Sequence, residues 1–179
     1  ENGFNIYSDG LKVYTTIDSK MQVYAEDAVE SHMHTLQNQL YREVKRTKLK
    51  PWCDPEVNWR EDKNYIPKHV KRTWQYKQAK EDGLSEAEIT AKMNKPVPMR
   101  IFSWNGTIDT VMSPLDSLKY YKQILHAGFM AMDPQTGNIK AWVGGINFSH
   151  FQYDHVNKRA TRQVGSTFKP IVYARAIED

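Results

Sequence analysis

The hydrophobic pattern changes its period near the start of the chain, from alternation to a repeat every three or four residues. Residues 11–16 are rich in β-branched and aromatic side chains, which predicts a strand. Asp18 is a suitable N-cap, and the repeat after it predicts one amphipathic helix from about residue 19 to the middle forties. The expected buried face of this helix comprises Met21, Ala25, Ala28, Val29, His32, Leu36 and Leu40.

The helical repeat breaks in residues 47–67, a stretch that contains three prolines. We expect this stretch to be mostly loop, with Trp52 and Trp59 anchoring it to the body of the protein. Residues 68–81 then predict a basic helix with Trp74 facing inward.

Two short elements follow. Residues 85–88, Ser-Glu-Ala-Glu, form a capping box that predicts a helix to about Asn94. Residues 99–112 predict a β-hairpin, because Asn105-Gly106 is a strong two-residue turn signal between two alternating segments.

A further helix and a second hairpin complete the pattern. Ser113 as N-cap and Pro114 at the first helical position predict a helix that ends before Gly128. Residues 128–143 alternate on both sides of the turn sequence Pro-Gln-Thr-Gly, which predicts the hairpin. Helices and hairpins in this order predict an α+β chain.

Composition excludes several classes of protein. No apolar run approaches the roughly 20 residues that span a bilayer. One cysteine, Cys53, allows no internal disulfide, and His32 and His34 do not share a helix face, so we expect neither a metal site nor a cofactor. The formal charge is +4, and residues 41–100 carry fifteen Lys and Arg against nine Asp and Glu.

The candidate chemistry is a single Ser-x-x-Lys, Ser166 to Lys169. Residues three apart on a helix are neighbours, so the lysine amine can act as a base toward the serine hydroxyl. The first helical turn also offers free N–H groups to a developing oxyanion. Alone, the motif is a weak signal, since an N-cap serine followed by an exposed lysine has the same spacing.

The surroundings of this motif resemble a known family. Residues 131–137 (Ala-Met-Asp-Pro-Gln-Thr-Gly), 141–145 (Ala-Trp-Val-Gly-Gly) and 162–170 (Arg-Gln-Val-Gly-Ser-Thr-Phe-Lys-Pro) resemble the start of the transpeptidase domain of class A, bifunctional penicillin-binding proteins. Residues 10–18 resemble the segment that leads into this domain from the glycosyltransferase half. The resemblance covers both ends of the chain and little of its middle.

The resemblance implies a partial penicillin-binding transpeptidase fold, like that of the serine β-lactamases. An antiparallel sheet would pack on helices, and we expect the strands at 11–16 and 99–112 to join the hairpin at 128–143. A helix beginning at Ser166 would dock behind the sheet.

Two regions are expected within this scheme. Residues 1–98 would form a mostly helical linker or accessory region with the long helix and the basic segment. Residues 99–179 would form the N-terminal part of the transpeptidase domain, truncated at the chain end.

The implied reaction is acyl transfer on peptidoglycan stem peptides that end in D-Ala-D-Ala. Ser166 would become acylated by the stem peptide or by a β-lactam, and Lys169 would take the serine proton. By the same resemblance, Gly165, Arg162 and Gln163 are assigned to substrate binding; an exposed role for Arg162 and Gln163 is the alternative.

Neither Ser-x-Asn nor Lys-Thr-Gly, the other motifs of that fold, follows Ser166. We therefore expect the isolated chain to be inactive. The chain begins with Glu1 rather than Met. With the resemblance, this implies a glycosyltransferase domain and a membrane anchor upstream, and a place on the extracytoplasmic or periplasmic side of the plasma membrane.

Three other functions stay open: a non-catalytic module that binds cell wall or protein, a basic nucleic-acid-binding domain, and a β-lactamase. The basic residues between Lys68 and Lys80 are interleaved with aromatic ones, as in proteins that bind single-stranded nucleic acid. No nucleic-acid motif accompanies them, so we expect a solvated helix face or attraction to an anionic surface, and no nucleic acid. The long segment before the hairpins argues against a compact β-lactamase.

Overall fold

The computed structural model describes residues 5, 8–54 and 58–178, in two compact units. The first unit contains residues 1–29 and 127–179, and the second contains residues 30–126. Helices and two-stranded antiparallel sheets make up the described residues, in agreement with the α+β class.

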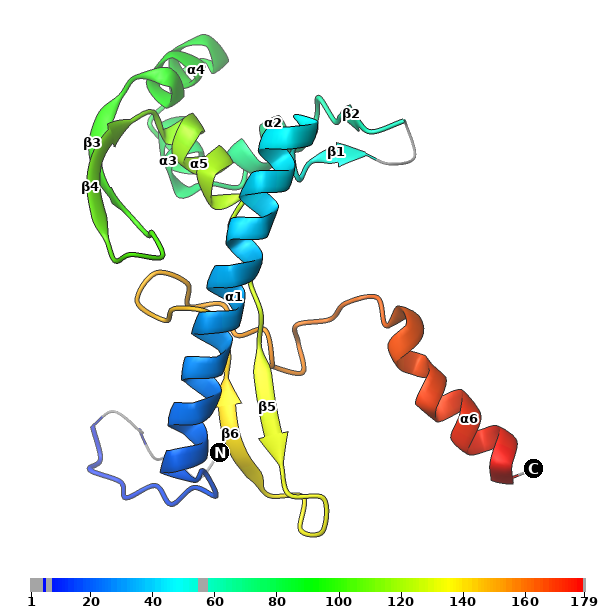
Figure 1. The fold of residues 1–179 in the computed structure, drawn as a ribbon. Coiled ribbons are helices and arrows are strands. Elements are labelled where there is room, and N and C mark those ends of the chain that lie inside the picture. The colour runs from blue at the N-terminus through cyan, green and yellow to red at the C-terminus, as the bar shows by residue number, and fades with distance from the viewer. Residues whose placement is uncertain (1–4, 6–7, 55–57, 179) are drawn as a thin grey trace. The chain divides into compact units, whose positions relative to one another are not determined.

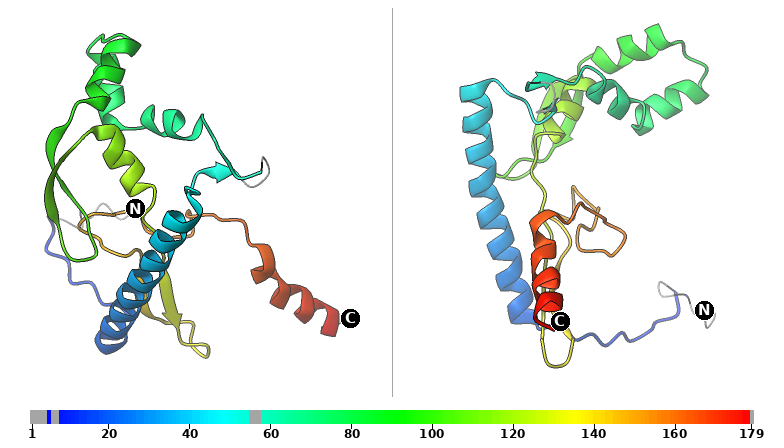
Figure 2. Two further views of the ribbon diagram at one scale, coloured as in Figure 1. Left: turned by 45° about the horizontal axis from the view of Figure 1, so that its top comes forward. Right: turned by 90° about the vertical axis from the view of Figure 1, so that its right-hand side faces the viewer.

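The longest element is α1 (Ser19–Thr47), which appears as one uninterrupted helix in Figures 1 and 2. Its predicted bounds are confirmed. The Asp18 carboxylate caps it by accepting the N–H groups of Lys20 and Met21 at 2.9 and 3.0 Å. This cap satisfies two of the N–H groups that the first helical turn leaves free.

The buried face of α1 differs from the predicted one. Met33 and Gln37 are buried, whereas Ala28 and His32 are exposed, and of the predicted face only Ala25 is fully buried. Val29, Leu36 and Leu40 are half-buried, so the predicted face is correct in part. The prediction included His32 but left out Met33 and Gln37, because the spacing of the apolar residues does not show that a glutamine is buried.

In the first unit, β5 (Phe129–Met132) and β6 (Ile139–Val143) form the predicted hairpin. Gly137 in the connecting turn has a φ of 72°, which a residue without Cβ adopts without strain. Ala141 and Val143 of β6 form a small apolar core with Ala25 of α1.

Residues 10–18 form neither helix nor strand, so the predicted strand at 11–16 is wrong. Only its end approaches β6. The Thr16 hydroxyl donates to the Ile139 carbonyl at 2.6 Å, and the Asp18 N–H donates to the Lys140 carbonyl at 2.9 Å. The side chains of Val13 and Tyr14 stay exposed, and β propensity without a packed face does not make a strand.

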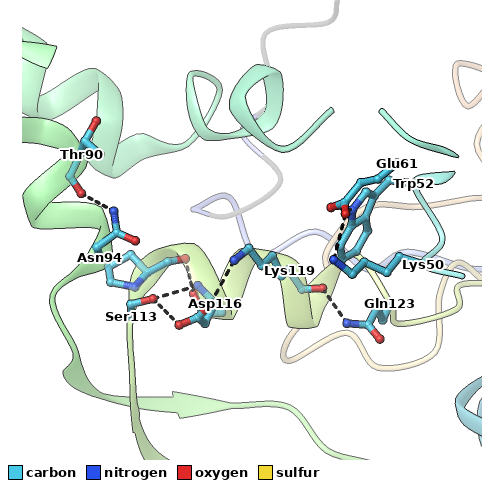
Figure 3. Close-up of polar contacts among 11 residues, drawn as sticks. Lys50, Trp52, Glu61, Thr90, Asn94, Ser113, Asp116, Lys119 and Gln123 are labelled. Carbon is cyan, nitrogen blue, oxygen red and sulfur yellow. Dashed lines mark hydrogen bonds and ion pairs between the residues drawn. The ribbon is translucent and has the colours of Figure 1, made fainter. Parts of the chain in front are cut away.

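The second unit begins with the end of α1 and a small hairpin, β1 (Cys53–Asp54) and β2 (Arg60–Glu61). Trp52 is a confirmed anchor: it is 4% exposed, and its indole N–H donates to Glu61 at 2.7 Å (Figure 3). Trp59 is 54% exposed, so its predicted anchoring is wrong.

The predicted basic helix at 68–81 is two helices, α2 (Tyr65–Val70) and α3 (Trp74–Glu81). Thr73 separates them, because its hydroxyl caps α3 by accepting the Tyr76 N–H. Trp74 thereby lies at the first position of α3 and is 71% exposed, which corrects its predicted inward orientation.

Helix α4 (Glu86–Asn94) begins with the predicted capping box between Ser85 and Glu88. Its Ile89 and Met93 are buried and pack with Ala79 of α3 in a local apolar core. The signal that predicted α4, its capping box, lies within four consecutive residues.

The hairpin of β3 (Val97–Ile101) and β4 (Ile108–Met112) is also confirmed, although its turn lies one residue earlier than predicted. Ser103 and Gly106 exchange two backbone hydrogen bonds at 3.1 Å, so Trp104 and Asn105 occupy the centre of the turn. Gly106 follows with a φ of 104°, where glycine is favoured.

Helix α5 (Pro114–Tyr121) has Ser113 as its N-cap and Pro114 in its first turn, as predicted, but it ends at Tyr121 instead of continuing to Gly128. The Ser113 hydroxyl donates to the Asp116 carboxylate at 2.7 Å and accepts the Asp116 N–H at 3.0 Å (Figure 3). Lys119, one turn further, pairs with the same carboxylate at 3.3 Å.

The strands of the described residues form three two-stranded sheets rather than one larger sheet. The expected division between residues 98 and 99 falls inside β3, whereas the compact units divide at 29/30 and 126/127. Which residues belong to which functional domain stays a prediction.

Candidate active site

The loop from 144 to 160 connects β6 to the Ser-x-x-Lys segment and folds back on the first unit's hairpin. The Asp154 carboxylate organises this loop by accepting the indole N–H of Trp142 at 3.1 Å and the backbone N–H groups of Val156 and Asn157 at 2.9 and 3.2 Å. The His155 N–H also donates to the Gly144 carbonyl at 2.7 Å.

Gly144 and Gly128 have a packing reason for lacking a side chain. A Cβ on Gly144 would lie 2.7 Å from the Asp154 carboxylate, and a Cβ on Gly128 would lie 2.8 Å from Val156. The loop therefore approaches the backbone of the hairpin closely. Nothing in the sequence identified Asp154 as the residue that makes this approach.

Ser166 lies in a short 3-10 helix, Gly165–Phe168, directly before α6 (Lys169–Glu178). The Lys169 N–H donates to the Ser166 carbonyl, so the two residues are the ends of one 3-10 turn. Side chains three residues apart eclipse in this geometry. The structure thus brings Ser166 and Lys169 one turn apart, and the α-helix begins at the lysine rather than at the serine.

Both residues are exposed to solvent, as is every described residue from 161 to 178. Among the described residues, the side chains of Ser166 and Lys169 make no hydrogen bond or ion pair, and the Ser166 N–H has no acceptor. The turn itself is held by Thr167, whose hydroxyl and N–H both donate to the Val164 carbonyl.

The predicted substrate-binding residues surround this turn. Gly165 opens it with a φ of 50°, a conformation that favours glycine. Arg162 and Gln163 are exposed, as in the alternative interpretation. Arg162 contributes to the electrostatics of His155, whose pKa is lowered by burial and by this guanidinium, against the opposite effect of Asp154.

The expected docking of a Ser166 helix behind the sheet does not occur. Helix α6 stands apart from β5 and β6 in Figure 1 and in the left view of Figure 2, and its apolar Ile171, Val172, Tyr173 and Ile177 are all exposed. The site therefore consists of a hydroxyl, an amine and a free backbone N–H on one exposed turn. These are the groups that an acylation reaction needs.

A Ser-x-Asn tripeptide does occur earlier in the chain, at Ser103-Trp104-Asn105. It forms the β3–β4 turn of the second unit: the Ser103 hydroxyl donates to the Gly106 carbonyl at 2.7 Å and accepts the Asn105 N–H at 3.2 Å. Its role in the fold is that of a turn.

Within the part of the chain that the structure describes, no three His, Cys, Asp or Glu side chains are grouped so that they could hold a metal ion. The helices of that same part include none with the length and apolarity to cross a bilayer.

Comparisons with known proteins agree on one family. The family model described as the penicillin-binding protein middle domain matches residues 47–125. Penicillin-binding protein 1A of Rickettsia prowazekii is 28% identical over 195 residues, covering 97% of this chain and 23% of that protein. Penicillin-binding protein 1A of Aquifex aeolicus is 27% identical over 184 residues, covering 96% of this chain and 23% of its own length.

A shorter match is closer in sequence. Penicillin-binding protein 2D of Bacillus subtilis is 43% identical over 54 residues, which are 30% of this chain and 8% of that protein. The chain thus spans less than a quarter of the length of the relatives that it matches along its whole extent. No solved structure matches it.

Proposed function

We propose that this chain, which belongs to the class A penicillin-binding proteins, is a segment of a peptidoglycan synthase in which Ser166 is the nucleophile of D-Ala-D-Ala transpeptidation. The observation that carries the proposal is the 3-10 turn that links Ser166 to Lys169 through a backbone hydrogen bond, with both side chains open to a ligand.

The proposed reaction begins with the Ser166 hydroxyl adding to the carbonyl carbon between the two terminal D-alanines of a stem peptide. The serine proton passes to the neutral Lys169 amine, and the Ser166 N–H donates to the oxyanion. When the C–N bond breaks, the lysine returns the proton to the leaving D-alanine. The amine of a neighbouring stem peptide then attacks the acyl carbon and gives up a proton to Lys169. The ester C–O bond breaks, and the lysine passes this proton to the Ser166 oxygen, which restores the hydroxyl.

A lysine acts as a base only in its neutral form, which removal from water favours. Lys169 is exposed in this structure. We therefore assign its enclosure, and the second oxyanion donor, to residues of the parent protein other than those in this chain. A β-lactam would acylate the same hydroxyl and leave an adduct on Ser166.

The parent protein would also carry glycosyltransferase activity and act in the cell envelope, on the extracytoplasmic side of the membrane that anchors it. Support for this placement comes from the relatives that cover nearly the whole chain, which are penicillin-binding proteins 1A.

The test is labelling of the full-length parent with a fluorescent penicillin. Ser166→Ala should abolish labelling, and Lys169→Ala should slow it roughly 10²–10⁴-fold, the contribution typical of a general base. Ser149→Ala is the matched control, because Ser149 is an exposed loop serine of the same unit, and it should label normally. Full labelling of Ser166→Ala would refute the assignment.

A further inference from the structure

An apolar groove lies within the second unit, between α2, α4 and α5, and has a volume of about 260 Å³. Ile89 and Met93 of α4 belong to the local core and form its floor. Ile66 and Val70 of α2 and Leu115 of α5 line it as well and are only half-buried, so they keep apolar surface in contact with water.

The charged side chains that line the groove differ in whether they are neutralised. The Glu86 carboxylate is bound by Lys80 at 2.8 Å and by the Tyr76 hydroxyl at 2.7 Å, and these contacts lower its pKa, with a smaller contribution from the charge of Lys71. Lys71, in contrast, makes no ion pair within the described residues, and the same is true of its neighbours Lys68 and Arg72. The available charge beside the groove is therefore positive.

The size of the groove restricts what can occupy it. Pockets for drug-sized ligands measure about 300–1,000 Å³, so this groove is smaller than most of them. It has room for one bulky apolar side chain of the kind that anchors a peptide or protein interface. A carboxylate next to that anchor would meet the unpaired cations at the end of α2.

We propose that this groove binds an acidic segment of a partner protein, with one bulky apolar side chain against Val70, Met93 and Leu115 and a carboxylate beside Lys71. The proposal goes beyond the acyl transfer assigned to Ser166, because it involves residues of the second unit alone and needs no acylation. It gives the basic middle of the chain a specific kind of anionic partner.

An anionic membrane is the competing binding partner, and substitution of a residue outside the groove would distinguish it. A bilayer is entered by protruding apolar side chains, and Trp74 at the start of α3 protrudes with 71% exposure. The residues of the groove instead line a recess. Trp74→Ala should therefore weaken binding to a membrane and leave binding in the groove nearly unchanged.

The test measures fluorescence anisotropy of labelled peptide pools with the 179-residue chain. One pool has ten-residue peptides with a single Leu or Phe flanked by Asp and Glu, and the matched pool has Lys and Arg in place of the acids. We expect the acidic pool to bind at least roughly tenfold more tightly at about 50 mM salt, and the difference to shrink at about 500 mM.

Two variants and one control distinguish the contribution of the positive charge from that of the shape of the groove. Lys71→Glu should weaken binding of the acidic pool roughly fivefold or more at low salt, whereas Lys92→Glu, the same charge change on α4 outside the groove, should change it less than roughly twofold. Thr90→Trp, at an exposed position lining the groove, should block binding at both salt concentrations. Circular dichroism verifies that each variant is folded.

The proposal is overturned if both pools bind alike, or if Lys71→Glu and Lys92→Glu have equal effects. It is also overturned if Thr90→Trp leaves binding intact. Binding to vesicles of phosphatidylglycerol and phosphatidylcholine that Trp74→Ala abolishes, without preference for acidic peptides, would assign the surface to a membrane instead. None of these results depends on penicillin labelling, so they can fail or succeed separately from the assignment of Ser166.

Discussion

Both units fasten an extended backbone segment to α1 with a glutamine amide, but they do so at different depths. In the first unit, Gln22 accepts the Trp142 N–H at 2.8 Å and donates to the Trp142 carbonyl at 3.0 Å. In the second unit, Gln37 accepts the Leu125 N–H and donates to the Gln123 carbonyl, both at 2.8 Å. Gln22 is half-buried, whereas Gln37 is completely buried.

The difference shows how the same pair of hydrogen bonds can have different importance. Water can replace the amide of Gln22 when it is removed, because the site is partly open. Gln37 itself is completely buried, so its loss leaves a donor and an acceptor unpaired where water enters less easily. Burial, rather than hydrogen-bond geometry, sets the energetic contribution.

One helix from each unit shows a similar difference in burial. Helix α4 has nine residues and buries Ile89 and Met93, while α6 has ten residues and buries none. Helix α4 thus belongs to a local core of the second unit, whereas α6, which follows the Ser166–Lys169 turn in the first unit, buries none of its residues. We expect truncation of an apolar side chain to destabilise the protein much more in α4 than in α6.

The largest difference in the free energy of unfolding is expected between alanine substitutions of two isoleucines. Ile89→Ala removes a side chain that is 2% exposed and should lower the free energy of unfolding by about 2–5 kcal/mol. Ile171→Ala, at 59% exposure on α6, should change it by less than about 0.5 kcal/mol. Urea unfolding of the 179-residue chain measures both, and equal losses would contradict the difference between the two helices.

Substitution of the two glutamines by leucine should give the next largest difference in the free energy of unfolding. Gln37→Leu should cost about 2–4 kcal/mol, because it removes a completely buried amide that satisfies two backbone groups, and Gln22→Leu about 1 kcal/mol. Gln39→Leu provides the control, since Gln39 is an exposed residue of α1, and its effect should stay within about 0.5 kcal/mol. If Gln22→Leu cost as much as Gln37→Leu, burial would not be the deciding factor.

At alkaline pH the second unit should weaken first. Burial, together with the Tyr120 phenol, raises the pKa of Tyr41 to about 12 from 10.0. The folded state therefore holds this proton more strongly than the unfolded chain, so the contribution is present below pH 10 and is lost as the pH rises toward 12. Absorbance of tyrosinate should show a late-titrating tyrosine that Tyr41→Phe removes; unchanged titration in this variant would contradict the assignment.

At acidic pH the stability of the first unit should also decrease, by a smaller amount and as the pH falls instead of rises. Burial and then Arg162 lower the pKa of His155 from 6.5, so the folded state favours the neutral ring. The unfolded chain binds the proton more readily, and stability should therefore fall as the pH drops below about 6.5. His155→Gln should flatten this part of the pH profile of unfolding, and an unaltered slope would show that another group is responsible.

Most helix ends were predictable because their signals are local. The Asp18 cap, the capping box at Ser85 and the Ser113 cap each act within three residues of the helix start. The turn at Asn105-Gly106 was placed only to within one residue, since glycine follows the turn instead of occupying its centre.

The turn that contains Ser166 and Lys169 was predictable in part for the same reason. The spacing of Ser166 and Lys169 already required them to be neighbours on any helix. The organisation of the preceding loop by Asp154 was not predictable, because its partner Trp142 lies twelve residues away on a strand and no sequence pattern pairs the two.

The sequence by itself determined the α+β class, the bounds of α1, α4 and both longer hairpins, and the pairing of a hydroxyl with an amine one turn apart. Only the tertiary structure decided which face of α1 is buried and that residues 11–16 form no strand. Gln22 and Gln37 bond to backbone 120 and 86 residues away, respectively. Local signals such as caps and turns act over a few residues, whereas burial depends on segments that meet only after the chain has folded.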